Sequence, residues 1–276
     1  MTLRGRGRSG APPILRHKDY DQPSVFAPEN LLREARRQKA LPVRTVPRIC
    51  VLDPDGDIVR NVLAGDQAIL DAHWACYHTQ LYTFEYDRMQ FGIIGSVVGA
   101  PFAVLVAEEL FACGCQLVIS VSSSGLILPE RTPPFFVLIE RALRDEGTSY
   151  HYLAPSVYVS ADNRVLTTLD DAFAEVRVPV CRGATWTTDA PFRETSVAIE
   201  YARSEGIIAV EMEAAGLYAL AQARRRPIIC FAHVTNRLGH VVGDFEKGDE
   251  WGSRDALQLI AATARAWGRR ASEDLL

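Results

Sequence analysis

The sequence predicts a single α/β domain, built on a central mixed, mostly parallel sheet that helices flank. Short apolar runs alternate with stretches whose apolar residues recur at helical spacing, which is the pattern of strands and helices in an α/β fold. Strands that read as continuous apolar runs are typical of parallel sheets buried on both faces. The chain has 276 residues, enough for one large core, and no linker-like segment divides it. We therefore expect one domain over residues 21–276, after a disordered tail over residues 1–20.

The first half of the chain alternates between strands and helices. Residues 28–40 begin with proline and continue with good helix formers, which predicts a helix. Residues 81–86 and 90–96 are split by Asp87 and Arg88, which predicts a hairpin. The other elements expected here are a strand at 48–52, a turn at 53–57, helices at 58–64 and 100–113, and a strand from 117.

The second half continues the same alternation. The buried strands expected are 178–181, 206–210 and 227–234, and the helices are 212–224 and 254–271. Residues 135–147 (FFVLIERALRDEG) are ambiguous, because their composition suits a helix while the apolar run after two prolines suits a strand.

Composition excludes several classes of protein. The net charge of −4 argues against a nucleic-acid binder, although Arg4, Arg6 and Arg8 make the start basic. No apolar segment is long enough for a membrane span, and none follows the basic start as a secretory signal would require. The six cysteines are scattered, and Cys113-Gly-Cys115 has no second ligand pair, so we expect neither disulfides nor a metal. The sequence predicts a cytoplasmic protein.

A serine-rich segment follows one of the predicted strands. Residues 117–127 read LVISVSSSGLI, a pattern that predicts a strand running into a tight polar loop at Ser122, Ser123, Ser124 and Gly125. Backbone N–H groups and hydroxyls of such a loop can hold an anion. The loop has no cationic residue, so from the residues alone it could hold a phosphate, an uncharged group or nothing.

Two glutamates open the helix predicted at 212–224. Glu211 and Glu213 are two residues apart, so on a helix they point in nearly opposite directions and only one is expected to face a ligand. A carboxylate accepts hydrogen bonds well from two adjacent hydroxyls, as in a ribose diol. The alternative is that both acids stabilise the first turn of the helix through its dipole.

Further candidates lie beside the predicted strands. Gly56 and Arg60 stand at a strand-to-helix turn, where free N–H groups and a guanidinium can bind an oxyanion. Thr235-Asn236-Arg237 ends a strand, where α/β sheets place ligands, and could read the edge of a base or simply close a turn. In residues 185–195, Trp186 and Phe192 could stack on a base beside Arg193, or pack in the core at a capped helix start.

Together these segments resemble the hexameric-type nucleoside phosphorylases, which include uridine and purine nucleoside phosphorylases, and are most similar to uridine phosphorylases. The resemblance covers roughly residues 48–270. VEMEAAGLY (210–218) matches the ribose-binding signature of the family, and GDIVR (56–60) matches its phosphate loop with Ile58 in place of proline. The family register makes 135–147 a strand that leads into a loop. Asn236-Arg237 falls on an Asn-Arg pair of uridine phosphorylases.

The resemblance implies a role for each matched residue. Met212 and Glu213 would hold the ribose, with Glu213 on the 2′ and 3′ hydroxyls. Inorganic phosphate, the co-substrate, would bind to the phosphate loop and the serine-rich segment, and the base would lie between an aromatic ring and two arginines. The residues concerned are Gly56, Arg60, Ser122, Ser123 and Gly125 for phosphate, and Trp186 or Phe192, Arg193, Asn236 and Arg237 for the base.

The sequence departs from the family at the phosphate site. The family carries an arginine at the position of Ser120, and a second arginine, donated by a neighbouring subunit, falls near Tyr77. Only Arg60 remains of three phosphate arginines, with His78 as a possible substitute across a subunit interface. Asn236 stands where purine enzymes carry the aspartate that protonates the base, which disfavours adenine but tolerates oxo-bases.

The leading interpretation is a pentosyltransferase that cleaves a uridine-like nucleoside with phosphate, giving free base and ribose 1-phosphate. The alternatives are hydrolysis, with water in place of phosphate, and a non-catalytic nucleoside-binding relative. We expect no cofactor and no metal, a homo-oligomer (a dimer or a hexamer), and no nucleic-acid or membrane partner.

Overall fold

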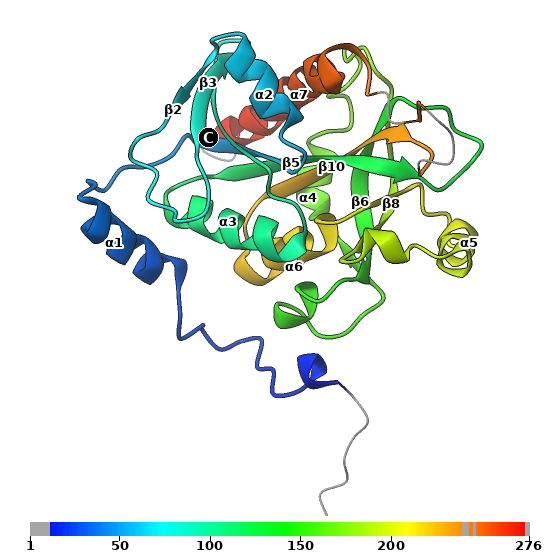
Figure 1. The fold of residues 1–276 in the computed structure, drawn as a ribbon, viewed down its shortest axis with the longest axis horizontal. Coiled ribbons are helices and arrows are strands. Elements are labelled where there is room, and N and C mark those ends of the chain that lie inside the picture. The colour runs from blue at the N-terminus through cyan, green and yellow to red at the C-terminus, as the bar shows by residue number, and fades with distance from the viewer. Residues whose placement is uncertain (1–11, 239–242, 245–246, 274–276) are drawn as a thin grey trace, which may run out of the picture.

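The computed structural model describes residues 12–238, 243–244 and 247–273. Its strands form one mixed sheet in the order β10-β6-β8-β9-β5-β1-β4-β3-β2, with β7 on β6 (Figure 1). Their bounds are β1 Ile49–Asp53, β2 Ala68–Leu70, β3 Tyr82–Tyr86, β4 Met89–Gly95, β5 Leu117–Leu126, β6 Phe135–Asp145, β7 Tyr158–Ser160, β8 Val180–Thr188, β9 Ala209–Glu211 and β10 Ile228–Asn236.

The sheet closes on itself at one end. β10 pairs with both β5 and β6, and β6 continues through β8 and β9 back to the end of β5. The strands from β1 to β2 extend the sheet from β5 as an open wing. Parallel pairings join β4, β1, β5 and β10, so the carboxyl ends of these strands lie at one edge of the sheet.

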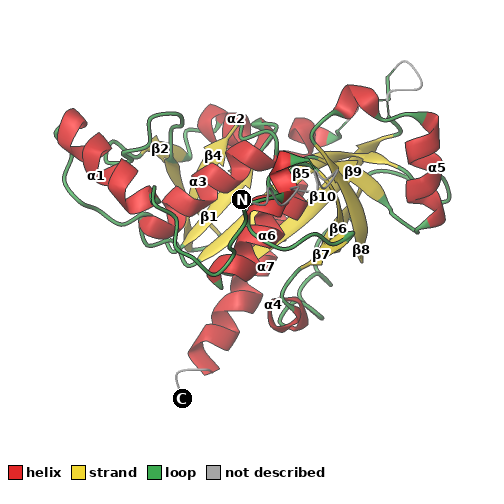
Figure 2. Cartoon of the chain, turned by 90° about the horizontal axis from the view of Figure 1, so that it is seen from below, coloured by secondary structure: helices red, strands yellow, loops and turns green. Residues whose placement is uncertain are grey.

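Helices cover both faces of the sheet. Figure 1 shows α2 and α7 on one side of β5 and β10, with α3 and α6 on the other, and Figure 2 gives the same chain from below. Gly216 of α6 permits the close packing of α3, since a Cβ there would lie 2.8 Å from the Cβ of Ala100. The helices are α1 Pro28–Lys39, α2 Asp57–Ala64, α3 Ala100–Ala112, α4 Asn163–Thr167, α5 Ser196–Ser204, α6 Ala214–Arg224 and α7 Ser253–Glu273, with short 3₁₀ turns η1 Pro13–Leu15, η2 Ser149–His151, η3 Pro191–Arg193 and η4 Asp249–Gly252.

The predicted class of fold is confirmed: one α/β unit with a mixed sheet flanked by helices. The hairpin at 81–96 is β3 and β4, and the ambiguous segment 135–147 contains the strand β6. β6 is a strand because β8 and β10 pair with its two edges and its first five residues are buried. The helix-like composition of 135–147 is therefore overridden by tertiary pairing.

The predicted polar loop at residues 122–125 is wrong. β5 continues through Leu126, so the serines and Gly125 are strand residues. Ser122, Ser123 and Ser124 pair with residues 232–234 of β10, and Gly125 pairs with Val210 of β9. β10 therefore pairs with the serines along one edge of β5, and on the other edge the N–H of Ser123 donates to the side chain of Asp55.

Part of the predicted N-terminal tail is described, and the helices can be checked for a membrane span. Residues 1–11 of the predicted tail lie outside the described residues; residues 12–20 include η1, and Lys18 Nζ lies 2.6 Å from His151 Nδ1. Within the described ranges, no helix combines the length and the apolar character needed to cross a membrane.

Candidate functional site

The candidate residues gather at the carboxyl edge of the sheet. Gly56 follows β1, Ser123 lies near the end of β5, and Asn236 ends β10. Glu213 follows β9, which runs antiparallel to β5, and reaches this edge through its bond to Gly99 after β4. This is the edge at which α/β sheets place ligands. The primary sequence scatters these residues over 180 positions, and the strand order β9-β5-β1 with β10 on β5 brings their strands together.

Glu213 is a buried carboxylate at the start of α6. Its side chain is 3% exposed, Oε1 accepts the backbone N–H of Gly99 at 2.7 Å, and Oε2 accepts that of Met212 at 3.3 Å. Gly99 has φ +88°, a conformation that favours glycine and aims this N–H at the carboxylate. Burial, and next the charge of Glu211, raise the pKa of Glu213 to about 8.

Glu211 has a different environment. Its carboxylate accepts four hydrogen bonds, from Thr185 Oγ1 (3.1 Å), Thr187 Oγ1 (2.5 Å) and the backbone N–H groups of Glu213 and Ala214 (both 2.7 Å). Burial raises the pKa of Glu211 and these hydrogen bonds oppose that rise. Glu211 therefore joins β8, β9 and α6, and Glu213 is the carboxylate with remaining acceptor capacity.

A second group of polar side chains surrounds the start of α2. Asp53 caps this helix by accepting the N–H groups of Gly56 (3.1 Å) and Val59 (2.9 Å). Burial above all raises the pKa of Asp53 to about 7. Arg60, one turn into α2, forms an ion pair with Asp57 and donates to the carbonyl of Asp55.

Ser123 of β5 faces this group. Its backbone N–H donates to Asp55 Oδ2 at 2.7 Å, and its Oγ lies 3.4 Å from Thr235 Oγ1. Lys247 completes the cluster, with Nζ 2.5 Å from Asp57 Oδ2 and 3.5 Å from Asp55 Oδ1. We define these residues, Asp53, Asp55, Asp57, Arg60, Ser123 and Lys247, as the α2 cluster.

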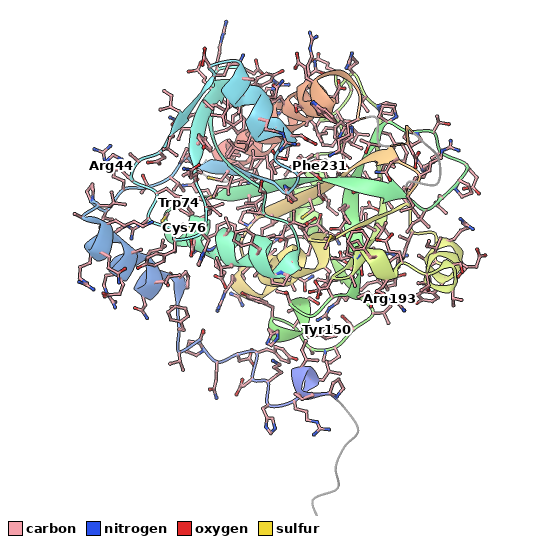
Figure 3. The ribbon with its side chains drawn as sticks, viewed as in Figure 1. Arg44, Trp74, Cys76, Tyr150, Arg193 and Phe231 are labelled. Atoms are coloured by element: carbon pink, nitrogen blue, oxygen red, sulfur yellow. The ribbon has the colours of Figure 1, made fainter. Side chains whose placement is uncertain are left out.

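His78 lies close to the start of α2 within the single chain. It lines a cavity of about 550 Å³ together with Gly56, Arg60 and Lys39. Lys39 Nζ is held at the wall of this cavity by the carbonyls of Ala75 (3.1 Å) and Cys76 (2.7 Å). Figure 3 labels Cys76 and, next to it, Trp74.

Asn236 is buried, and its amide is used within the protein. Oδ1 accepts the N–H of Leu238 at 3.0 Å, and Nδ2 lies 3.5 Å from the carbonyl of Ser124. The side chain thus closes the turn after β10, as the alternative interpretation of Thr235-Asn236-Arg237 expected. Arg237 is exposed at the same turn.

The aromatic candidates separate in space. Trp186 lies in β8, is 3% exposed, packs with Ile127 and Val210, and donates to Asp145 Oδ2 at 3.0 Å. Trp186 is therefore a core residue. The predicted strand at 178–181 is too short to include it, whereas β8 continues to Thr188 and carries Trp186 into the core. Phe192 on η3 is 98% exposed, and the neighbouring Arg193 is exposed too (Figure 3).

Sequence reasoning missed Asp55 and Lys247. Asp55 lies in the segment DPDGD (53–57), which the sequence analysis predicted only as a turn. The signal that could have found it is the charge pattern, since three acids in five residues beside a phosphate-loop motif are unusual. Lys247 lies far from Asp55 in the sequence, and no local pattern links the two.

The arrangement defines an α/β protein with the nucleoside phosphorylase-like fold. The family model described as "Phosphorylase superfamily" matches residues 48–265, and the chain belongs to that superfamily.

Several curated relatives and solved structures are similar to this chain. A uridine phosphorylase of Thermococcus kodakarensis is 29% identical over 214 residues (67% of this chain, 77% of that protein). A guanosine phosphorylase of Halorubrum lacusprofundi is 26% identical over 165 residues (59% of this chain). The chain spans 66% of the length of that protein and of an uncharacterised mimivirus protein that is 29% identical.

Solved structures agree on the fold. The uridine phosphorylase of Vibrio fischeri superposes with a TM-score of 0.67 at 20% identity, covering 79% of this chain and 90% of that chain. A 5′-methylthioadenosine/S-adenosylhomocysteine nucleosidase of Campylobacter jejuni superposes with a TM-score of 0.63 at 14% identity, covering 81% and 100%.

Proposed function

We propose that this protein cleaves the N-glycosidic bond of a nucleoside. The observation that carries the proposal is Glu213, a buried carboxylate at the carboxyl edge of the sheet with acceptor capacity left after its bonds to Gly99 and Met212. A carboxylate held in this way can accept hydrogen bonds from the 2′ and 3′ hydroxyls of a ribose. Membership of the phosphorylase superfamily supports the same reading.

In this proposal the base of the nucleoside binds between the end of β10 and η3. Arg193 and Arg237 are exposed cations that can stabilise charge on a departing pyrimidine, and Phe192 is the exposed ring that can stack on it. Trp186, buried in the core, is not part of the base site. A uridine-like base is the proposed substrate, in line with the name of the Thermococcus kodakarensis relative.

Two groups can take up the ribosyl unit. Phosphate is the acceptor that the names of the phosphorylase relatives suggest, and Gly56, Arg60 and Ser123 would bind it. Water is the second candidate, because Ser120 supplies no charge and both cations of the α2 cluster already pair with carboxylates. A phosphate dianion needs cationic partners to offset its desolvation.

The test is release of free base from uridine, guanosine, inosine and adenosine by the purified protein, followed by chromatography, with and without phosphate. Release from at least one nucleoside is expected. A ligand-induced thermal shift without any base release would support a non-catalytic nucleoside-binding protein instead.

The protein also has surfaces suited to self-association, and we propose that it works as a homo-oligomer, a dimer or a hexamer, in the cytoplasm. β2 is an edge strand that exposes Ile69 (73%) and Leu70 (47%), and Tyr77 nearby in sequence is 41% exposed. Unpaired apolar edges of this kind are usually covered in the assembled protein.

A further inference from the structure

Asp55 occupies the place where an anion would bind in the α2 cluster. The position is defined by groups that favour negative charge: the start of α2, the backbone N–H of Ser123, and the cations Arg60 and Lys247. Asp55 Oδ2 accepts the Ser123 N–H at 2.7 Å, and Oδ1 lies 3.5 Å from Lys247 Nζ. The anion held at this position is thus the chain's own carboxylate.

The cations of the cluster are already matched. Lys247 has a side chain only 15% exposed and lies against Asp57 as well as Asp55, while Arg60 pairs with Asp57. Asp53 is a third acid behind them, with both oxygens on N–H groups of α2. Two cations of the α2 cluster therefore face at least two carboxylates, so the cluster itself offers an incoming phosphate no net positive charge.

Phosphate would also have to displace Asp55 from Ser123. The displaced carboxylate cannot move far, because it is fixed to the backbone one residue before Gly56, which lies at the start of α2. Phosphate and Asp55 would then be like charges in contact, which disfavours the bound state. A neutral nucleophile meets none of these obstacles.

We infer that Asp55 decides which acceptor takes the ribosyl unit: it excludes phosphate and leaves water as the nucleophile. This inference rests on the proposed function and selects between its two acceptors. Asp55 is a specificity-determining residue, and Lys247 holds its carboxylate in place.

The resulting step is a hydrolysis. The oxygen of water forms a bond to the anomeric carbon, and the bond from that carbon to the base nitrogen breaks with its electron pair on the nitrogen. One proton of the water passes to solvent, and the base takes up one proton from solvent. The products are ribose and the free base.

The experiment compares wild type with Asp55→Ala, which empties the position, and with Asp55→Asn, which keeps an oxygen acceptor for Ser123 but removes the charge. Asp171→Asn is the matched control, because Asp171 is exposed and outside the α2 cluster. Base release and the sugar product (ribose or ribose 1-phosphate) are measured with and without millimolar phosphate. Binding of inorganic phosphate is measured separately by phosphorus NMR on the same proteins.

The expected results differ between variants. Wild type and Asp171→Asn release base at a rate unchanged by phosphate, form ribose, and bind phosphate only weakly. Asp55→Ala or Asp55→Asn binds phosphate roughly tenfold more tightly than wild type, as loss of one adjacent charge predicts. Ribose 1-phosphate formed by wild type, or saturable phosphate binding equal in wild type and both variants, would overturn the inference. Absence of base release from every nucleoside counts against the proposed function instead, and the binding comparison still decides the role of Asp55.

Discussion

At the scale of single residues, Glu211 and Glu213 are two positions apart in the sequence but have different roles. Glu211 has a structural role, and Glu213 is the proposed ligand-binding carboxylate. Both are buried, but Glu211 has four donors and Glu213 has two, both from the backbone. The sequence predicted that only one of them faces a ligand, and it could not say more about the other because the hydroxyls that bind Glu211, on Thr185 and Thr187, come from a distant strand.

The first prediction concerns this pair. Glu211→Ala leaves buried hydroxyl and N–H donors without acceptors, so it should lower the free energy of unfolding by about 2–4 kcal/mol. Glu213→Ala should cost less, since it removes a buried carboxylate with few partners. Denaturant unfolding of both variants measures the difference, and equal losses would contradict the division of roles.

The second prediction concerns pH. The pKa of Glu213 is raised to about 8, so the ligand-free protein carries this group protonated at lower pH. Because the ribose hydroxyls need the carboxylate, kcat/KM should rise with pH through a midpoint near 8. Folding stability moves the other way: the contribution of Glu213 is present below its ordinary pKa of 4.5 and is lost as pH rises through about 8.

Glu213→Gln should remove both effects. A pH profile of kcat/KM for this variant that keeps the same rising limb would assign the titration to another group.

At the scale of elements, the buried hydroxyl of Tyr218 ties the middle of α6 to two strands. Tyr218 donates to the carbonyl of Ile139 in β6 (2.6 Å) and accepts the N–H of Cys230 in β10 (3.2 Å). This helix begins directly after Glu213, so its attachment to two strands also positions the carboxylate.

The third prediction tests that attachment. Tyr218→Phe should lower the free energy of unfolding by about 1–2 kcal/mol, because a buried N–H and a buried carbonyl lose their partner. Tyr201→Phe on α5 is the control, since Tyr201 is 49% exposed. Denaturant unfolding that gives the same free energy for both variants would show that the hydroxyl of Tyr218 contributes nothing.

The predicted helices and strands agree with the structure in some places and differ from it in others. The helix and strand periods placed α1, α3 and α6, because each has its own apolar or helix-forming pattern. The same reasoning ended β5 too early, because Ser122, Ser123 and Ser124 are strand residues only by virtue of β10 beside them. The extension of β8 to Thr188, which buries Trp186, likewise depends on its pairing with β6 and β9.

At the scale of the whole molecule, closure of the sheet through β10 and β9 gathers the site, while β2 ends the open wing. Strand order is set by long-range pairing that no local pattern encodes, so the family resemblance, not periodicity, brought Gly56, Ser123 and Glu213 to one site. Asp55 and Lys247 lay outside both kinds of reasoning.

The fourth prediction concerns assembly. Ile69→Glu places a charge on the exposed edge strand β2, where Ile69 is 73% exposed, and should reduce the oligomer to smaller species. Light scattering after size exclusion measures the mass. Ile69 lies on the surface of the single chain, so a variant that unfolds rather than dissociates would contradict this assignment, as would one with the mass of wild type.

The central claim is that Glu213 holds the ribose of a nucleoside whose glycosidic bond is cleaved. The most direct measurement is kcat/KM for a ribonucleoside and its 2′-deoxy analogue with wild type and Glu213→Gln, using Glu200→Gln on the exposed face of α5 as the control. Wild type and the control should prefer the ribonucleoside by roughly tenfold or more, and Glu213→Gln should lose most of that preference. An undiminished preference in Glu213→Gln, or no cleavage of any nucleoside by wild type, would contradict the claim.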